Sequence, residues 1–116
     1  MYVYIVVLVF ILFDIVTGLM KAFYNDGLNS TVLRKGLFHK LSEVVAVAGA
    51  GLAEVGMRYI NLGFEIPMLH SVAIYICLME FVSIAENISE VNPQLGKFFA
   101  PYLAKLKAKQ EDKKND

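Results

Sequence analysis

Charge and cysteine are both scarce in this chain. Only 19% of its 116 residues are charged, against about 25% in an average soluble domain. The single cysteine, Cys77, excludes an intrachain disulfide. The two histidines, His39 and His70, are isolated in the sequence, so with one cysteine they offer no ligand set for a metal ion.

Patterns typical of enzymes and of nucleotide-binding proteins are missing as well. There is no Walker-type or GxGxxG loop and no nucleophile elbow. The acids lack metal-ligand spacing, and Ser83 has no histidine within plausible reach in the sequence. We therefore expect that the protein is not an enzyme, that it holds no cofactor or metal, and that it has no nucleic-acid partner.

Apolar residues are abundant and gather in long runs. They make up 57% of the chain, and charged segments separate them into three runs where a soluble domain would spread them in short periods. The sequence predicts an all-α integral membrane protein with three transmembrane helices, at about residues 2–24, 41–60 and 68–90, and a C-terminal amphipathic interfacial helix at about 93–109. These form one domain over residues 1–110, followed by a charged disordered tail at 111–116.

The third run, from His70 to Asn87, carries a carboxylate within a length that spans a bilayer. About 20 helical residues cross a hydrocarbon core of roughly 30 Å. On a helix, Glu80 shares a narrow face with Ser83 and Asn87, while apolar side chains cover most of the rest. Because a carboxylate in lipid is costly, it usually faces a bundle interior or a wet cavity. These three residues are therefore candidate pore-lining or inter-helix polar residues.

The first run, residues 2–19, lacks the basic segment and the small-residue cleavage site of a secretory signal, so we expect it to remain as a transmembrane helix. Its strongly apolar residues outweigh the insertion cost of Asp14. Asp14 shares a helical face with Thr17, Gly18 and Lys21. Two interpretations are open: Asp14 lies near the headgroups and pairs with Lys21, or Asp14 and Thr17 act between helices or along a pore.

The segment between the first two runs, residues 20–42, carries four basic residues against one acid. Its Asn-Asp-Gly sequence at residues 25–27 predicts a turn. Asn29 or Ser30 can cap a short helix, which we expect to lie along the membrane surface. The basic residues are Lys21, Arg34, Lys35 and Lys40, and the acid is Asp26.

The second run, residues 43–60, is the least apolar, because it contains Glu43 and Glu54 and few large side chains. Glu43 and Glu54 are further candidate pore or inter-helix polar residues, and Arg58 is placed to pair with Glu54. Small residues gather on one side, the pattern that lets helix backbones approach closely in membranes. We expect helix packing there, either within one chain or between copies, through Ala46, Gly49, Ala50, Ala53 and Gly56.

The segment after the third run is amphipathic. Apolar residues from Leu95 to Leu106 recur at helical spacing, and lysines occupy other positions. We expect an interfacial helix, bent at Pro101, that binds the membrane surface. A tail that only keeps the protein soluble and oriented accounts for the lysines but not for the aromatic residues. The expected surface residues are Lys97, Phe98, Phe99, Tyr102 and Lys105.

The distribution of basic residues predicts the orientation. The 20–42 segment and the tail are rich in Lys and Arg, whereas Glu65 is the only charge in the loop at 61–69. Basic segments stay on the cytoplasmic side of a membrane. With three crossings, the N-terminus lies outside and the C-terminus lies in the cytoplasm.

Several motifs resemble those of one family. The chain reads Asp-Ile-Val-Thr-Gly from Asp14, Arg-Lys-Gly-Leu from Arg34 and Glu-Phe-Val-Ser-Ile-Ala-Glu-Asn from Glu80, followed by Pro93. Over residues 14–93 this combination resembles the phage lysis and clostridial toxin-secretion holins, and the string from Glu80 is its most specific part. Family members often place a Gly-x-Pro element soon after the Glu-Asn pair, where this chain reads Ile-Ser-Glu-Val-Asn-Pro.

The resemblance implies a pore former of the bacterial cytoplasmic membrane. Such holins accumulate in the membrane, assemble into large homo-oligomers and open lesions that release an endolysin or a toxin. The implied partners are the lipid bilayer, further copies of the chain, endolysin or toxin as cargo, and an antiholin. The candidate polar residues of the three runs fit this role, because they can face one another in a single chain and face water in a ring.

Three other classes of function stay open. A small oligomeric ion or proton channel, or a transporter, can use Asp14 and Glu80 to carry protons or cations, although the chain lacks internal repeats. A membrane anchor or assembly subunit without a pore is a second alternative. A soluble helical bundle is disfavoured by the length and continuity of the first run.

Overall fold

The computed structural model describes residues 2–25, 27–61, 63 and 66–115, and from residue 110 onward it describes only the helical backbone. Asp26, which belongs to the predicted turn, and Glu65, the single charge of the predicted outer loop, lie outside the described residues.

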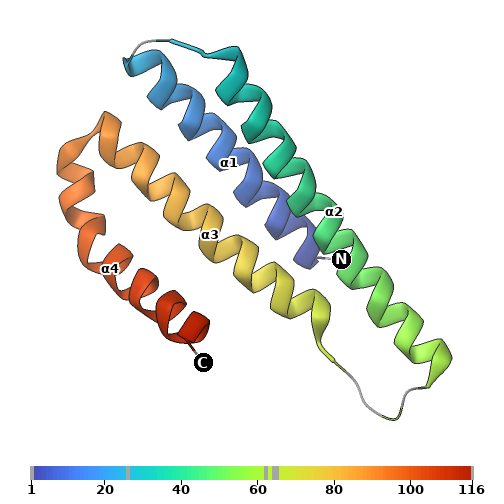
Figure 1. The fold of residues 1–116 in the computed structure, drawn as a ribbon. Helices are drawn as coiled ribbons and strands as arrows, with labels where there is room; N and C mark the ends of the chain where they lie inside the picture. The colour runs from blue at the N-terminus through green and yellow to red at the C-terminus, as the bar shows by residue number, and fades with distance from the viewer. Residues whose placement is uncertain (1, 26, 62, 64–65, 116) are drawn as a thin grey trace. The chain divides into compact units, whose positions relative to one another are not determined.

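The described chain consists of helices joined by short connections: α1 (Tyr2–Asn25), α2 (Ser30–Ile60), α3 (Met68–Val91) and α4 (Pro93–Asn115) (Figure 1). No strand occurs among the described residues, so the all-helical prediction is confirmed. Two of the described helices, α1 and α3, are long and apolar enough to cross a membrane. They correspond to two of the three predicted spans.

The second helix differs from the prediction. α2 is one helix of 31 residues, where the sequence predicted a short surface helix and a separate span from about residue 41. Its expected cap is confirmed, because Asn29 Oδ1 accepts the N–H groups of Thr31 and Val32 at 3.0 and 3.3 Å. The expected break was wrong because residues 30–42 contain no proline, and Gly36 in a helix interior costs only about 1 kcal/mol relative to alanine.

Left-handed residues end α1 and α2. Gly27, with φ of 91°, follows α1, and its N–H donates to the Ala22 carbonyl at 2.6 Å. Asn61, with φ of 53°, follows α2, and its N–H donates to the Met57 carbonyl at 3.0 Å. Glycine and asparagine accept this backbone conformation most readily. Gly27, the last residue of the predicted turn, adopts it after the end of α1.

The last helix is longer than predicted. α4 runs to Asn115, so residues 111–115, expected as a disordered tail, continue the helix. Glu111, Lys113 and Lys114 in this stretch favour helix. Pro101 lies inside α4 and cannot donate a backbone hydrogen bond. Figure 1 shows the axis of α4 changing direction between its two halves, in agreement with the predicted bend.

The chain divides into two compact units. The first consists of residues 1–11 and 29–77, which include the start of α1, all of α2 and the start of α3. Within it, Tyr4 lies against α2 so closely that a Cβ added to Gly51 would overlap the Tyr4 hydroxyl. The buried apolar residues of this unit are Val7, Ile11, Val47, Ala50, Ala73 and Ile76.

The second unit consists of residues 12–28 and 78–116, which include the end of α1, the end of α3 and α4. In this unit α1 and α3 run side by side in the same direction, because residue 14 contacts residues 83 and 87 while residue 21 contacts residue 90. α4 returns onto α3, where the rings of Phe81 and Phe99 meet edge to face with centroids 6.4 Å apart. The polar contacts of α1 with α3 thus lie within one unit.

Candidate functional site

A hydrogen-bonded polar cluster joins α1 and α3 in the second unit. Ser83 Oγ donates to Asp14 Oδ1 at 2.6 Å, and Asn87 Nδ2 donates to the same oxygen at 3.0 Å. Asn87 Nδ2 also donates to Thr17 Oγ1 at 3.1 Å, and the Thr17 hydroxyl donates to the Phe13 carbonyl at 2.9 Å. We call Asp14, Thr17, Ser83 and Asn87 the Asp14 cluster.

Helical spacing brings the members of the Asp14 cluster together. Asp14 and Thr17 are three residues apart on α1, and Ser83 and Asn87 are four apart on α3, so each pair shares a face. Asp14, Thr17 and Asn87 are 6%, 7% and 8% exposed. A buried carboxylate without hydrogen bonds is costly, and here Asp14 receives two donors from α3. Asp14 therefore contacts a second helix, which is one of the two interpretations of this residue that the sequence left open.

Glu80 lies one turn before Ser83 on α3 and is only 2% exposed. Glu80 and Asn87 both lie on the buried side of α3. This is the face that the sequence predicted Glu80, Ser83 and Asn87 to share. The acid most deeply embedded in the described part of α3 is therefore adjacent along the helix to the Asp14 cluster.

Two ion pairs lie near the Asp14 cluster, in the C-terminal parts of α1 and α3. Lys21 Nζ lies 3.6 Å from Glu90 Oε1, and Asn25 Nδ2 donates to Glu90 Oε2 at 3.4 Å. Lys107 Nζ of α4 lies 2.8 Å from Glu86 Oε1. The paired side chains are about half exposed, so each pair contributes no more than about 1 kcal/mol. The charged residues of these pairs on α1 and α3 follow the apolar part of each helix.

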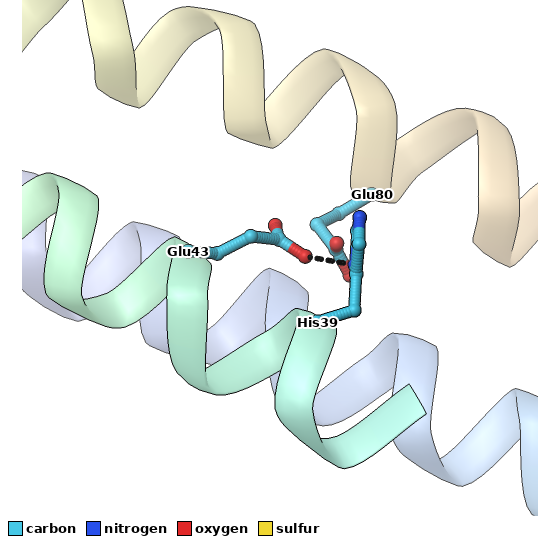
Figure 2. Close-up of side chains that lie close together, drawn as sticks. All are labelled: His39, Glu43 and Glu80. Atoms are coloured by element: carbon cyan, nitrogen blue, oxygen red, sulfur yellow. Dashed lines mark ion pairs between the residues drawn. The ribbon is translucent and has the colours of Figure 1, made fainter. Parts of the chain in front are cut away.

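On α2, Glu43 lies beside basic residues. Its Oε1 is 3.0 Å from His39 Nδ1 and 3.9 Å from Lys40 Nζ, and Figure 2 shows His39 and Glu43 on successive turns of the helix. Neither carboxylate oxygen receives a well-directed hydrogen bond from the described residues, although the side chain is 10% exposed. Glu43 thus lies close to one lysine ammonium group and one imidazole ring. The four-residue spacing of His39 and Glu43 in the sequence is the signal for this contact.

The other acid of α2 caps a helix. Glu54 Oε1 accepts the backbone N–H of Leu69 at 3.1 Å, in the first turn of α3. A carboxylate at this end of a helix satisfies a free N–H and complements the helix dipole. The predicted ion pair between Glu54 and Arg58 is absent from the described contacts, because the carboxylate is directed to α3 instead.

The predicted small-residue side of α2 is mostly open. Ala46 and Gly49 are exposed, Ala53 and Gly56 are half-buried, and only Ala50 is buried. A Cβ added at Gly49 or at Gly56 would meet nothing within 4 Å. The side of α2 that packs inside the chain is the neighbouring one, with Glu43, Val47, Ala50 and Gly51 buried. Gly51 was not among the predicted packing residues, although its four-residue spacing from Val47 was a signal for it.

The predicted surface residues of α4 divide between solvent-exposed and packed positions. Lys97 and Lys105 are exposed, and Phe98 and Tyr102 are 64% and 55% exposed. Phe99 instead packs against Phe81 of α3. The exposed rings and lysines therefore lie on a helix anchored to α3 by one phenylalanine and by the Lys107–Glu86 pair.

Polar side chains are buried in this protein while large apolar ones are exposed. The buried polar residues include Asp14, Thr17, Glu80 and Asn87. The exposed apolar residues on the two most apolar helices include Leu8, Leu12, Phe13 and Val16 of α1 and Ile74, Tyr75 and Met79 of α3. Large apolar side chains exposed in such number are unusual on a soluble monomer, whereas lipid favours this partition.

Comparison with known proteins identifies the family. The sequence model of the bacteriophage holin family matches residues 1–108. The chain belongs to the bacteriophage holin family. This confirms the resemblance found in the motifs around Asp14 and Glu80, and the holin family together with α1 and α3 makes this a membrane protein. Holins are in general non-enzymatic pore formers. No curated protein and no solved structure matches this holin.

Proposed function

We propose that this holin forms a pore: it assembles into homo-oligomers in the bacterial cytoplasmic membrane and opens a lesion that releases an endolysin or a toxin. The match of the bacteriophage holin family to residues 1–108 carries the proposal. The buried polar residues of α1 and α3 support it. Helices with an apolar exterior and buried polar groups can line a water-filled pore when several copies assemble.

We further propose that α2 crosses the membrane, which gives the three spans expected from the sequence. α1 and α3 run in the same direction in the second unit, so the connection between them has to return across the bilayer if both helices span it. α2 is the only described helix in that connection. At 1.5 Å per residue its 31 residues reach about 46 Å, more than the roughly 30 Å of a hydrocarbon core.

The polar residues of α2 do not prevent this crossing, because its acids have partners. Glu43 lies beside His39 and Lys40, and Glu54 accepts a hydrogen bond from the start of α3. With three spans, the basic residues of 20–42 and of α4 lie on the cytoplasmic side and the N-terminus lies outside.

We assign contacts between copies to the open side of α2. Ala46, Gly49 and Gly56 lack bulky side chains, and a Cβ added at either glycine would meet no atom of the described chain within 4 Å. In membranes, helix association depends on close packing of backbones, and small residues permit it. Of the two uses left open for these small residues, contact between copies therefore has the better support.

The proposed opening step is the replacement of internal hydrogen bonds by water. In the single chain, Asp14 receives hydrogen bonds from Ser83 and Asn87. In a ring of copies the same groups, with Glu80, face a wet lumen, where hydration replaces the lost bonds without the cost of a carboxylate in lipid. An antiholin that binds the single chain would delay this step.

The test is protein release from cells and vesicles. Glu80→Gln, expressed at the level of the unchanged chain, should shift the time at which lysis or leakage begins. Glu90→Gln is the matched control, because Glu90 is exposed on the same helix and its pair with Lys21 is weak. Unchanged timing in Glu80→Gln would remove Glu80 from the mechanism, and vesicles that never release a folded protein would refute the pore itself.

A second candidate is a small oligomeric ion or proton channel, or a transporter. The observation that favours it is the deep burial of Asp14 and Glu80 inside apolar helices, since intramembrane acids often carry protons or cations. The same vesicles discriminate the two functions. A channel or carrier passes selected ions and retains an encapsulated protein, whereas a holin lesion releases both.

A further inference from the structure

We propose that a groove between α4 and α3 binds one anionic phospholipid, with an acyl chain against aromatic side chains and the phosphate between Lys105 and Lys109. The groove lies within the second unit and has a volume of about 590 Å³. It is formed by Phe81 of α3 and by Phe98, Phe99, Tyr102, Lys105 and Lys109 of α4.

The apolar part of the groove is a continuous aromatic surface. The Phe99 ring lies 6.4 Å from Phe81 and 5.7 Å from Phe98, and the Phe98 ring lies 6.0 Å from Tyr102. Phe98 and Tyr102 are nevertheless more than half exposed, so the described chain leaves this surface uncovered. A cleft of about 300–1,000 Å³ is typical of small-molecule sites, and the groove, at about 590 Å³, lies within this range.

In the cationic part of the groove, no carboxylate of the described side chains, which end at Lys109, lies in an ion pair with a lysine. Lys105 and Lys109 are four residues apart, so their ammonium groups project from the same side of α4 and repel each other. Among the described side chains no carboxylate pairs with either of them, whereas Lys107, on the opposite side of the helix, is paired with Glu86 at 2.8 Å. A phosphate between the two lysines relieves their repulsion, and a lipid with net negative charge suits two cations better than a zwitterionic one.

The position of the groove matches a lipid better than a peptide. Phe81 lies ten residues, or about 15 Å, before the end of α3, within a helix apolar enough to span the membrane. The aromatic surface therefore borders hydrocarbon, while the lysines require headgroups and water. This inference depends on α3 residing in a membrane and not on pore formation.

The chain contains no tryptophan, so Phe98→Trp places a single fluorescent reporter in the groove. The full chain with this substitution is embedded in phosphatidylcholine nanodiscs that contain a small fraction of brominated phosphatidylglycerol or, separately, of brominated phosphatidylcholine. Bromine quenches tryptophan on contact. We expect phosphatidylglycerol to quench at about tenfold lower mole fraction, because each nearby lysine strengthens binding to an anionic lipid.

Lys105→Gln combined with Lys109→Gln should abolish the preference for phosphatidylglycerol. Lys35→Gln combined with Lys97→Gln is the matched control: it removes the same charge from exposed positions outside the groove and should keep the preference. Equal quenching by the two lipids, a preference that survives in the groove variant, or its loss in the control would overturn the proposal. So would an absence of quenching, which would mean that protein covers the groove. Since no leakage is measured, this result is independent of the pore.

Discussion

Asn87→Ala tests whether the Asp14 cluster holds α1 against α3. The substitution removes the hydrogen bonds from Asn87 Nδ2 to Asp14 Oδ1 and to Thr17 Oγ1. Hydrogen bonds between helices in membranes average about 0.6 kcal/mol and reach about 1.7 kcal/mol each. Loss of both should lower the free energy of unfolding by about 1–3 kcal/mol, since Asp14 keeps the Ser83 hydroxyl at 2.6 Å.

The same α3 supplies graded comparisons. Ser83→Ala removes one bond to Asp14 and should cost about half as much as Asn87→Ala. Ser89→Ala is the matched control: its hydroxyl donates to the Ala85 carbonyl of its own helix, so its removal should change the free energy of unfolding by less than about 0.5 kcal/mol. The measurement is equilibrium unfolding in mixed micelles by increasing fractions of sodium dodecyl sulfate, followed by circular dichroism.

A double-mutant cycle separates the energy of the hydrogen bond between Asn87 and Asp14 from the other effects of shortening either side chain. Asp14→Ala and Asn87→Ala should be non-additive by more than about 0.5 kcal/mol, because each removes the same hydrogen bond. Equal destabilisation by Asn87→Ala and Ser89→Ala, or additive effects of Asp14→Ala and Asn87→Ala, would refute the assignment of inter-helix stabilisation to this cluster.

Two further predictions concern α2. Glu54→Leu leaves the Leu69 N–H without its acceptor and should destabilise the protein by about 1 kcal/mol in the same micelle titration. Glu54→Gln keeps an oxygen acceptor and should retain most of the stability of the unchanged chain. Equal losses in the two variants would mean that this hydrogen bond does not contribute to stability. Gly49→Leu should leave the helicity of the single chain unchanged, because no group of the described chain lies within 4 Å of a Cβ at Gly49. It should reduce assembly in detergent about tenfold, because close helix contact needs small residues. Assembly is measured by particle size and by cross-linking. Gly36→Leu, equally open but outside the small-residue side, is its control, and equal assembly of both variants would contradict the role of that side.

The sequence by itself determined the helical class, the two most apolar spans and the residues that share a face. Helical periodicity fixes the direction of a side chain relative to its own helix axis. The alignment of Asp14 with Thr17 and of Glu80 with Ser83 and Asn87 could therefore be read directly, and these residues lie on the buried sides of α1 and α3. The family resemblance followed from the same strings of residues.

Only the tertiary structure decided which polar group meets which. Lys21 was a candidate partner of Asp14 along one helix, yet it pairs with Glu90 of α3, and Glu54 contacts Leu69 rather than Arg58. Likewise, α2 buries the side with Gly51 and leaves Gly49 open. Periodicity cannot predict these outcomes, because the rotation and register of one helix against another depend on side-chain packing between segments distant in the chain.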